Sequence, residues 1–297
     1  MYKKILVPLD GSKLAEIALS YTAGLIKRLP GVEVDLLHVY NAREKVMAPM
    51  YRAYVEQAAA GISKRLADTA TKVSGELAIG NTADEILRFG DKHKTDLIIM
   101  ATHGRSGINR WAMGSIAYKV MRSGKKPVCL IRAGIKEKTV VEKANGNTVL
   151  VPLDGSKRAE SVLPYVEELV KQIGLDKIEV VLLRVCEPPK VSSDYPSSMP
   201  LSWEEHVERE QIGCKLVTGP YLAEVGKRLK DAGFRVQTEI PLGKAAKEII
   251  KYAEKNESSL IAMSTHGRSG ISRWAYGSIA EKVMLGTLTP VLMVGQK

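Results

Sequence analysis

Runs of consecutive apolar residues alternate along the chain with longer stretches in which apolar residues recur at helical spacing. In the first half, the apolar runs predict strands at about Lys4–Pro8, Val32–Val39, Glu76–Ile79, 95–101 and 127–131. The stretches between them predict helices at about Lys13–Leu29, Met50–Lys72, from Thr82 onward, and at Gly114–Arg122. A capping box formed by Thr82 and Glu85 is expected to begin the third of these helices. Uninterrupted apolar strands joined by helices are typical of a parallel sheet with helices on both faces.

The whole pattern occurs twice because the chain contains an internal repeat. ILVPLDGSKLAEIAL at Ile5–Leu19 returns as VLVPLDGSKRAESVL at Val149–Leu163, and the long motif at Thr102–Met121 returns at Thr265–Met284. The sequence therefore predicts an α/β protein of two repeated doubly wound domains, each with a five-stranded parallel sheet. We assign residues 1–134 and 147–297 to the two domains and the polar segment 135–146 to a linker.

The second copy is longer than the first between its two motifs. The offset between equivalent residues is 144 at Asp10 and Asp154 but 163 at Gly104 and Gly267, a gain of 19 residues. The stretch Glu187–His206 is rich in proline and serine, so we expect the extra residues to form a long loop after the second strand of this copy.

Composition favours a soluble globular protein. Hydrophobic residues make up 45% and charged residues 26% of the 297, and no window is apolar and long enough to span a membrane. The N-terminal residues lack the apolar core of a signal peptide. Cys129, Cys186 and Cys214 have no metal-ligand spacing, so we expect no metal site, a buried Cys129, ordinary packing for the other two, and a cytosolic location.

The net charge of +11 raises the possibility of nucleic-acid binding. Residues 1–144 contain 24 Lys and Arg against 14 Asp and Glu, whereas the remaining residues are nearly neutral. The basic residues are scattered and are not interleaved with aromatic residues. We therefore interpret the excess as a solvated basic face and expect no nucleic-acid partner.

The unusual residues of each copy follow strands, where ligands bind in a doubly wound sheet. Pro8, Asp10, Gly11 and Ser12 follow the first strand, while Gly104, Gly107, Gly114 and Ser115 follow the fourth. Glycines allow backbone amides to approach an anion, and a helix that begins at Ser115 offers free N–H groups. Asp10 suits a ribose hydroxyl or a metal. The residues that add positive charge are Arg105 and Arg110, and in the second copy Arg268 and Arg273.

Each of these features also has a purely structural interpretation. Asp10 and Ser12 could simply form a turn and cap the following helix, and the glycine pair could serve a tight turn. His103 and His266 are candidate acid–base residues, although a histidine at such a place more often orients a loop. Trp111 and Trp274 fit packing better than base stacking.

Taken together, ILVPLDGS, LLHV and THGRSGINRWAMGSIAYKV with PVCLI resemble the universal stress protein family over nearly all of both halves. The resemblance implies an α/β fold in which the last strands, Val128–Ile131 and Val291–Val294, pair across a pseudo-twofold axis. The tandem chain would then be an intrachain dimer, and whole chains could pair further into a homodimer.

One branch of that family binds ATP through Gly, two residues, Gly, nine residues, then Gly and Ser or Thr. The resemblance implies nucleotide contacts at Pro8, Asp10, Val39, Ala101, Gly104, Arg105, Ser106, Gly107, Gly114, Ser115, Ile116 and Ala117. In the second copy it implies Pro152, Asp154, Val185, Ser264, Gly267, Arg268, Ser269, Gly270, Gly277, Ser278, Ile279 and Ala280. The aspartates would contact ribose, Val39 and Val185 adenine, and the glycine-rich and helix-start backbone the phosphates.

The chain departs from this motif at its first glycine, which is Ala101 in one copy and Ser264 in the other. A Cβ there is expected to weaken binding if the position needs a positive φ or a close backbone approach. Arg184 replaces His38 at the neighbouring strand end.

These observations predict a cytosolic stress-response protein that binds ATP, ADP or AMP, with or without Mg²⁺, in a regulatory role and is not an enzyme. Two alternatives stay open. One is a nucleotide-free scaffold for an unknown protein partner. The other is a slow ATP hydrolase or self-phosphorylating protein with His103 and Asp10 as its candidate residues, although no P-loop or kinase motif is present.

Overall fold

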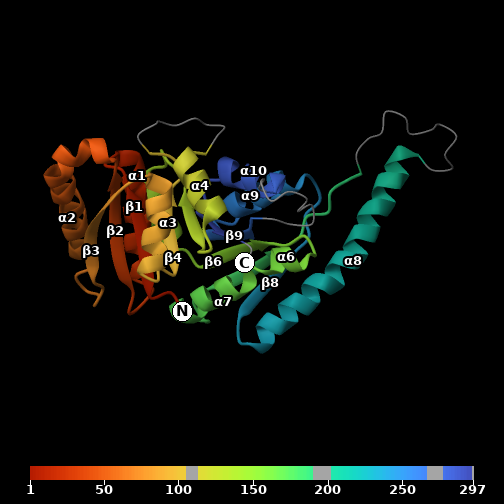
Figure 1. The fold of residues 1–297 in the computed structure, drawn as a ribbon. Helices are drawn as coiled ribbons and strands as arrows, with labels where there is room; N and C mark the ends of the chain where they lie inside the picture. The colour runs from red at the N-terminus through yellow and green to blue at the C-terminus, as the bar shows by residue number, and fades with distance from the viewer. Residues whose placement is uncertain (105–112, 190–201, 266–276, 296–297) are drawn as a thin grey trace.

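The strands of both halves form one sheet in the computed structural model, which describes residues 1–104, 113–189, 202–265 and 277–295 (Figure 1). The first half contributes β1 (Lys4–Leu9), β2 (Glu33–Tyr40), β3 (Val73–Ile79), β4 (Leu97–Ala101) and β5 (Val128–Ile131). The second half contributes β6 (Thr148–Pro152), β7 (Glu179–Leu183), β8 (Arg235–Glu239), β9 (Leu260–Ser264) and β10 (Val291–Val294).

The strand order is the same in both halves when it is read outward from the centre of the sheet. It runs β3-β2-β1-β4-β5-β10-β9-β6-β7-β8, parallel within each half and antiparallel between β5 and β10, where Leu292 lies opposite Cys129. Both the fold class and the predicted pairing of the two last strands are confirmed. The order reverses between β1 and β4, and again between β6 and β9, so each half has one switch point.

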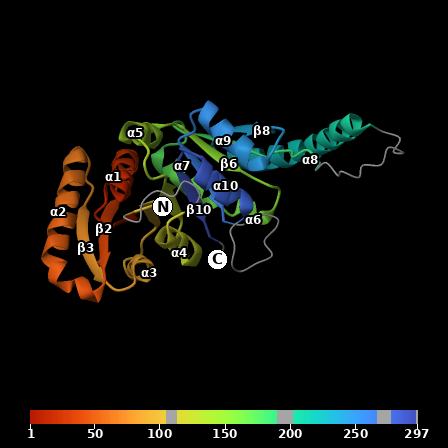
Figure 2. The ribbon, with the colours of Figure 1, turned by 90° about the horizontal axis from the view of Figure 1, so that it is seen from above.

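Helices cover both faces of this sheet. Their bounds are α1 (Lys13–Ile26), η1 (Ala42–Met47), α2 (Ala48–Arg65), α3 (Thr82–Lys92), α4 (Ser115–Ser123), α5 (Glu137–Asn145), α6 (Lys157–Glu160), α7 (Leu163–Ile173), α8 (Trp203–Asp231), α9 (Ala245–Lys255) and α10 (Ser278–Gly286). Buried side chains of α1, α2, α5, α7 and α8 form one core, and those of α3, α4, α9 and α10 form the other. Figure 2 shows α2 and α3 on opposite sides of β2 and β3. Both cores continue across the β5–β10 pair and therefore join the halves.

The segment predicted as a polar linker is largely helix α5, which packs on α1. Val140 and Ala144 of α5 are buried. A Cβ at Gly24 of α1 would lie 2.6 Å from the Cβ of Ala144, so glycine is needed for this close approach. The connection between the copies is thus part of the packed structure.

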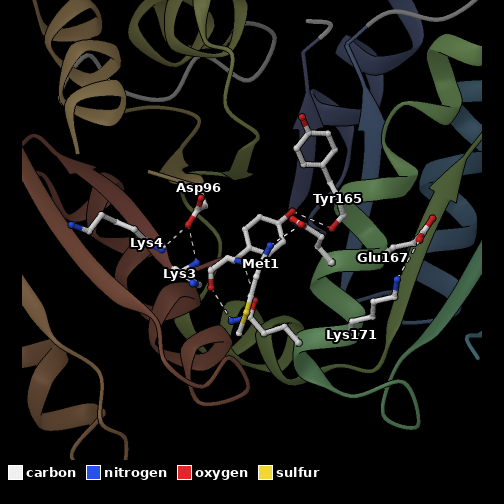
Figure 3. A network of polar contacts seen from close by, with 10 residues as sticks. Met1, Lys3, Lys4, Asp96, Tyr165, Glu167 and Lys171 are labelled. Atoms are coloured by element: carbon white, nitrogen blue, oxygen red, sulfur yellow. Dashed lines mark hydrogen bonds and ion pairs between the residues drawn. The ribbon is translucent and has the colours of Figure 1, made fainter. Parts of the chain in front are cut away.

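The N-terminal residues also tie the first half to the second. The backbone N–H of Tyr2 donates to Oε1 of Gln172 at 3.0 Å, and Nε2 of Gln172 donates to the Tyr2 carbonyl at 2.8 Å. The Tyr2 hydroxyl donates to the Tyr165 carbonyl at 3.1 Å. Figure 3 shows this segment between the strands of the first half and α7, with Asp96 accepting from the backbone of Lys3 and Lys4.

Several helix boundaries differ from the predicted ones for local reasons. Asn81, and not Thr82, caps α3, since its side chain accepts from the N–H of Asp84. The second copy breaks the equivalent of α1 into α6 and α7 at Pro164, which lacks an N–H and takes the place of Ser20. The remaining boundaries shift by a few residues: α1 ends at Ile26, α2 spans Ala48–Arg65, and β3 begins at Val73.

The predicted long loop in the second copy is partly helical. Ser202 caps α8 through a capping box with Glu205, so Trp203–His206 belongs to a helix of 29 residues. Residues 190–201 of that stretch lie outside the described residues.

The expectation of ordinary packing for two of the cysteines is wrong. Cys186 and Cys214 form a disulfide that joins the segment after β7 to α8. Cys129 is free and buried, as expected. The use of cysteine therefore does not support a reducing compartment. In the part of the chain that the structure describes, no helix is long and apolar enough to cross a membrane.

Candidate functional site

A cavity of about 380 Å³ lies at the carboxyl ends of β1, β2 and β4, at the switch point of the first half. Its walls include every described residue that the sequence predicts for the first site, namely Pro8, Asp10, Val39, Ala101, Gly104, Gly114, Ser115, Ile116 and Ala117. Arg105, Ser106, Gly107, Arg110 and Trp111 lie outside the described residues.

The second half contains a matching cavity of about 420 Å³. It is lined by Pro152, Asp154, Val185, Ser264, Gly277, Ser278, Ile279 and Ala280, again all the described members of the predicted set. His266, Gly267, Arg268, Ser269, Gly270, Arg273 and Trp274 lie outside the described residues. Both volumes fall in the range of small-molecule sites.

Asp10 belongs both to a turn and to the cavity wall. One carboxylate oxygen, Oδ1, accepts from the backbone N–H and the hydroxyl of Ser12 at 2.9 and 2.7 Å. Ser12 in turn caps α1 by accepting from the N–H of Ala15. Asp154 and Ser156 repeat these bonds at 2.9 and 2.6 Å. The structural interpretation of this motif is therefore correct, and it fixes the carboxylate at the edge of the cavity.

The second carboxylate oxygen of Asp10 faces Gly104. A Cβ at Gly104 would lie 2.0 Å from Asp10 Oδ2, which is far too close for any contact. Glycine is required at this position because the carboxylate already fills the space of a side chain. Gly104, which follows β4, and Asp10, which follows β1, therefore pack directly against each other.

The N-terminal ends of α4 and α10 open into the cavities. Neither helix has a side-chain cap, and Gly114 and Gly277, their cap residues, bond back to the carbonyls of Thr102 and Thr265. The first-turn N–H groups and the positive end of the helix dipole favour an anion here. The first turn of α10 contains Glu281, whereas that of α4 has no acidic residue, so α4 offers the more positive end.

The two departures from the glycine motif do not strain the backbone. Ala101 and Ser264 are the last residues of β4 and β9, and neither belongs to the residues with positive φ. Both are largely buried and line the cavities. The cost expected from a positive φ is therefore absent, whereas the expected cost from a close backbone approach of a ligand stays a prediction.

His103 lines the first cavity beside the switch point. Its Nδ1 lies 3.1 Å from the hydroxyl of Thr102, which also accepts from the N–H of Ala133. If Thr102 donates to Nδ1, Nε2 carries the ring proton; if Nδ1 carries the proton, it donates to Thr102 and Nε2 is an acceptor. Nε2 is buried and has no partner among the described residues.

Sequence reasoning missed the apolar walls and the disulfide. Each cavity has three large apolar residues on one side: Leu37, Ile86 and Met100 in the first, and Leu183, Ile249 and Met263 in the second. Aligning the copies by the 163-residue offset puts Cys214 at the position of Tyr51, while Cys186 follows β7 as Tyr40 ends β2. The rings of Tyr40 and Tyr51 lie 5.3 Å apart, so the two cysteines occupy positions that are neighbours in the first copy, a proximity that only the structure shows.

Comparison with known proteins relates nearly the whole chain to one protein family. The model of the universal stress protein family matches residues 1–132 and 146–295. Universal stress protein Slr1230 of Synechocystis is 24% identical over 98% of this chain and 99% of its own. Universal stress protein MJ0577 of Methanocaldococcus jannaschii is 30% identical over 44% of this chain and 96% of its own. A solved universal stress protein from Archaeoglobus fulgidus has the same fold, with a TM-score of 0.71 and 20% identity over all of both chains.

Proposed function

Since the chain belongs to the universal stress protein family, we propose that it binds an adenine nucleotide in one or both cavities and acts as a regulatory protein in the stress response. The observation that supports the proposal most is the repeated cavity at each switch point. There a fixed carboxylate and an uncapped helix end meet beside an apolar wall.

Each part of a nucleotide has a counterpart in the first cavity. The apolar wall with Leu37 and Met100 suits the adenine ring, next to the backbone of Val39. The Asp10 carboxylate, which lines the cavity, suits ribose hydroxyls, and the first turn of α4 suits phosphates. The Nε2 of His103 would add one donor to a phosphate oxygen. A Mg²⁺ ion would enter with ATP, held mainly by its phosphates.

We propose binding without turnover. A hydrolase needs a group that activates water, and in the tautomer in which Thr102 donates to Nδ1, His103 is a donor and not a base. The carboxylate of Asp10 is held by Ser12. Phosphate release from ATP that disappears in His103→Ala would contradict this part of the proposal and restore the hydrolase alternative.

A regulatory role requires that the nucleotide-bound and nucleotide-free chains differ in conformation, and that a partner binds one of these conformations more tightly. A ligand shifts such an equilibrium only through different affinities for the two states. We propose a cytosolic location because adenine nucleotides are abundant there, although the disulfide between Cys186 and Cys214 does not itself favour that compartment. Homodimerisation of whole chains stays a prediction.

The direct test is to denature freshly purified protein and identify the released small molecules by chromatography and mass spectrometry. The proposal expects ATP, ADP or AMP in a fixed ratio to the chain, and a lower ratio in Gly104→Val, where the side chain would displace Asp10. A nucleotide-free chain that also shows no thermal shift with millimolar ATP and Mg²⁺ would favour the scaffold alternative.

A further inference from the structure

The two cavities differ in charge at the place where the ribose would lie. In the first, position 38 is a histidine that is 3% exposed, with Nδ1 2.9 Å from the Leu9 carbonyl and its ring 4.4 Å from that of Tyr51. In the second, the equivalent residue is Arg184, which lines the cavity. The described lining of the first cavity contains neither Lys nor Arg.

The guanidinium of Arg184 is held beside the turn that contains Asp154. It lies over the ring of Tyr221, 5.4 Å from the ring centre. A Cβ at Gly155 would lie 2.8 Å from Arg184 Nη1, and Gly155 has a φ of +87°, so glycine both forms the turn and admits the guanidinium. The cation therefore lies beside the turn that follows Asp154, the residue that would meet the ribose.

This cation has no anionic partner among the residues that the structure describes. Among these residues its guanidinium makes no hydrogen bond or ion pair, and it lies over the ring of Tyr221. Glu160, which accepts from the Tyr221 hydroxyl, pairs instead with Lys157 and Arg228. A planar fork of unused N–H donors in a cavity suits an oxyanion, above all a phosphate.

We propose that the second cavity takes an adenine nucleotide that carries a phosphate on its ribose 2′ or 3′ oxygen, with Arg184 as the ligand of that phosphate. The inference rests on the proposed function, because it places the ribose at Asp154. Dinucleotide-binding proteins use the same chemistry, in which a carboxylate reads free ribose hydroxyls and a nearby arginine accommodates a ribose phosphate. The negative charge of Glu281 in the first turn of α10 disfavours an anion at that helix end. Arg184 is therefore the more favourable place for a phosphate in the second cavity.

The test uses the full chain with the substitution Gly104→Val, which blocks the first cavity so that calorimetry reports on the second. Three probes are titrated: AMP, adenosine 2′,5′-bisphosphate and adenosine 3′,5′-bisphosphate. We expect one bisphosphate to bind at least tenfold more tightly than AMP, as a charge-assisted bidentate contact provides.

Variants at two positions separate the role of Arg184 from general charge or folding effects. Arg184→His restores the residue of the first copy and should reduce the preference for the bisphosphate to within about threefold. Tyr221→Phe keeps the ring under the guanidinium and should retain the preference, whereas Tyr221→Leu should lower it. Thermal unfolding of each variant confirms that it is folded.

The outcomes distinguish this inference from the proposed function. AMP binding with no preference for either bisphosphate, or a preference that survives Arg184→His, would overturn the inference and leave the nucleotide site standing. Failure of all three probes to bind would overturn both.

Discussion

At the scale of single residues, the aspartate after the first strand of each copy links the fold to the site. One oxygen of Asp10 holds Ser12 and thereby the start of α1, and the other faces Gly104 at the end of β4. A ligand that contacts this carboxylate would therefore touch both sides of the switch point. Asp154 holds Ser156 in the same way.

The replaced motif glycines give a prediction at this scale. Ala101 and Ser264 have ordinary strand conformations, so there is no backbone strain for Ala101→Gly or Ser264→Gly to relieve. Each should instead destabilise the protein by about 0.5–1 kcal/mol, because glycine loses more conformational entropy on folding. Urea unfolding measures the stability and calorimetry the affinity. A tenfold gain in AMP affinity in either variant would show that the Cβ does obstruct the ligand.

Much of the site could be predicted at the residue scale because strand ends in a doubly wound sheet converge. The repeated motifs specify Asp10, Gly104 and Ser115, and all three line one cavity. The cap at Asn81 and the role of Thr102 beside His103 could not be predicted, since they depend on side-chain directions at loop ends. Arg184 has no anionic partner among the described residues, and this likewise depends on the direction of the Glu160 side chain, which pairs with Arg228.

At the scale of elements, α8 is the main difference between the copies. It is 29 residues long where α2 has 18, and the disulfide between Cys186 and Cys214 attaches it to the end of β7. Cys214 itself lines the second cavity. A covalent bond in the second copy therefore takes the place of the contact between Tyr40 and Tyr51 in the first.

Counting reactive thiols tests this bond. Burial raises the pKa of the Cys129 thiol to about 12, so little thiolate exists near neutral pH, and the side chain is 2% exposed. An aromatic disulfide reagent should find no thiol in the native protein, one after unfolding, and three after unfolding with prior reduction. Three thiols on unfolding without a reductant would contradict the disulfide.

Removal of the disulfide should also lower stability. The bond closes a loop between residues 28 apart, for which chain-entropy arguments give about 3–4 kcal/mol. Cys214→Ser should lower the free energy of unfolding by up to this amount. Reduced wild-type protein is the matched control and should behave like the variant in guanidinium unfolding. An unchanged midpoint in both would show that the bond does not constrain the unfolded chain.

At the scale of the whole molecule, the two copies share one ten-stranded sheet and continuous cores. Sequence similarity to a family of paired domains was sufficient to predict the β5–β10 contact. It did not predict the packing of α5 on α1 or the hydrogen bonds between the N-terminal residues and the second half. Those contacts use residues outside the repeated motifs, such as Gly24 and Tyr2.

This continuity predicts that the chain unfolds as one unit. Separate opening of either half would expose Leu292 and Cys129 in the shared sheet, which are each 2% exposed. Urea unfolding followed by far-ultraviolet circular dichroism and by tryptophan fluorescence should give coincident single transitions. Two resolved transitions would show that the halves are energetically independent.

Calorimetric titration of the full chain with AMP tests whether the repeated cavities are nucleotide sites. We expect saturable binding to one or two sites per chain, with one site lost in Gly104→Val or in Gly277→Val, since each residue lines one cavity. Absence of binding at millimolar AMP, or binding that neither substitution alters, would contradict the proposed nucleotide sites.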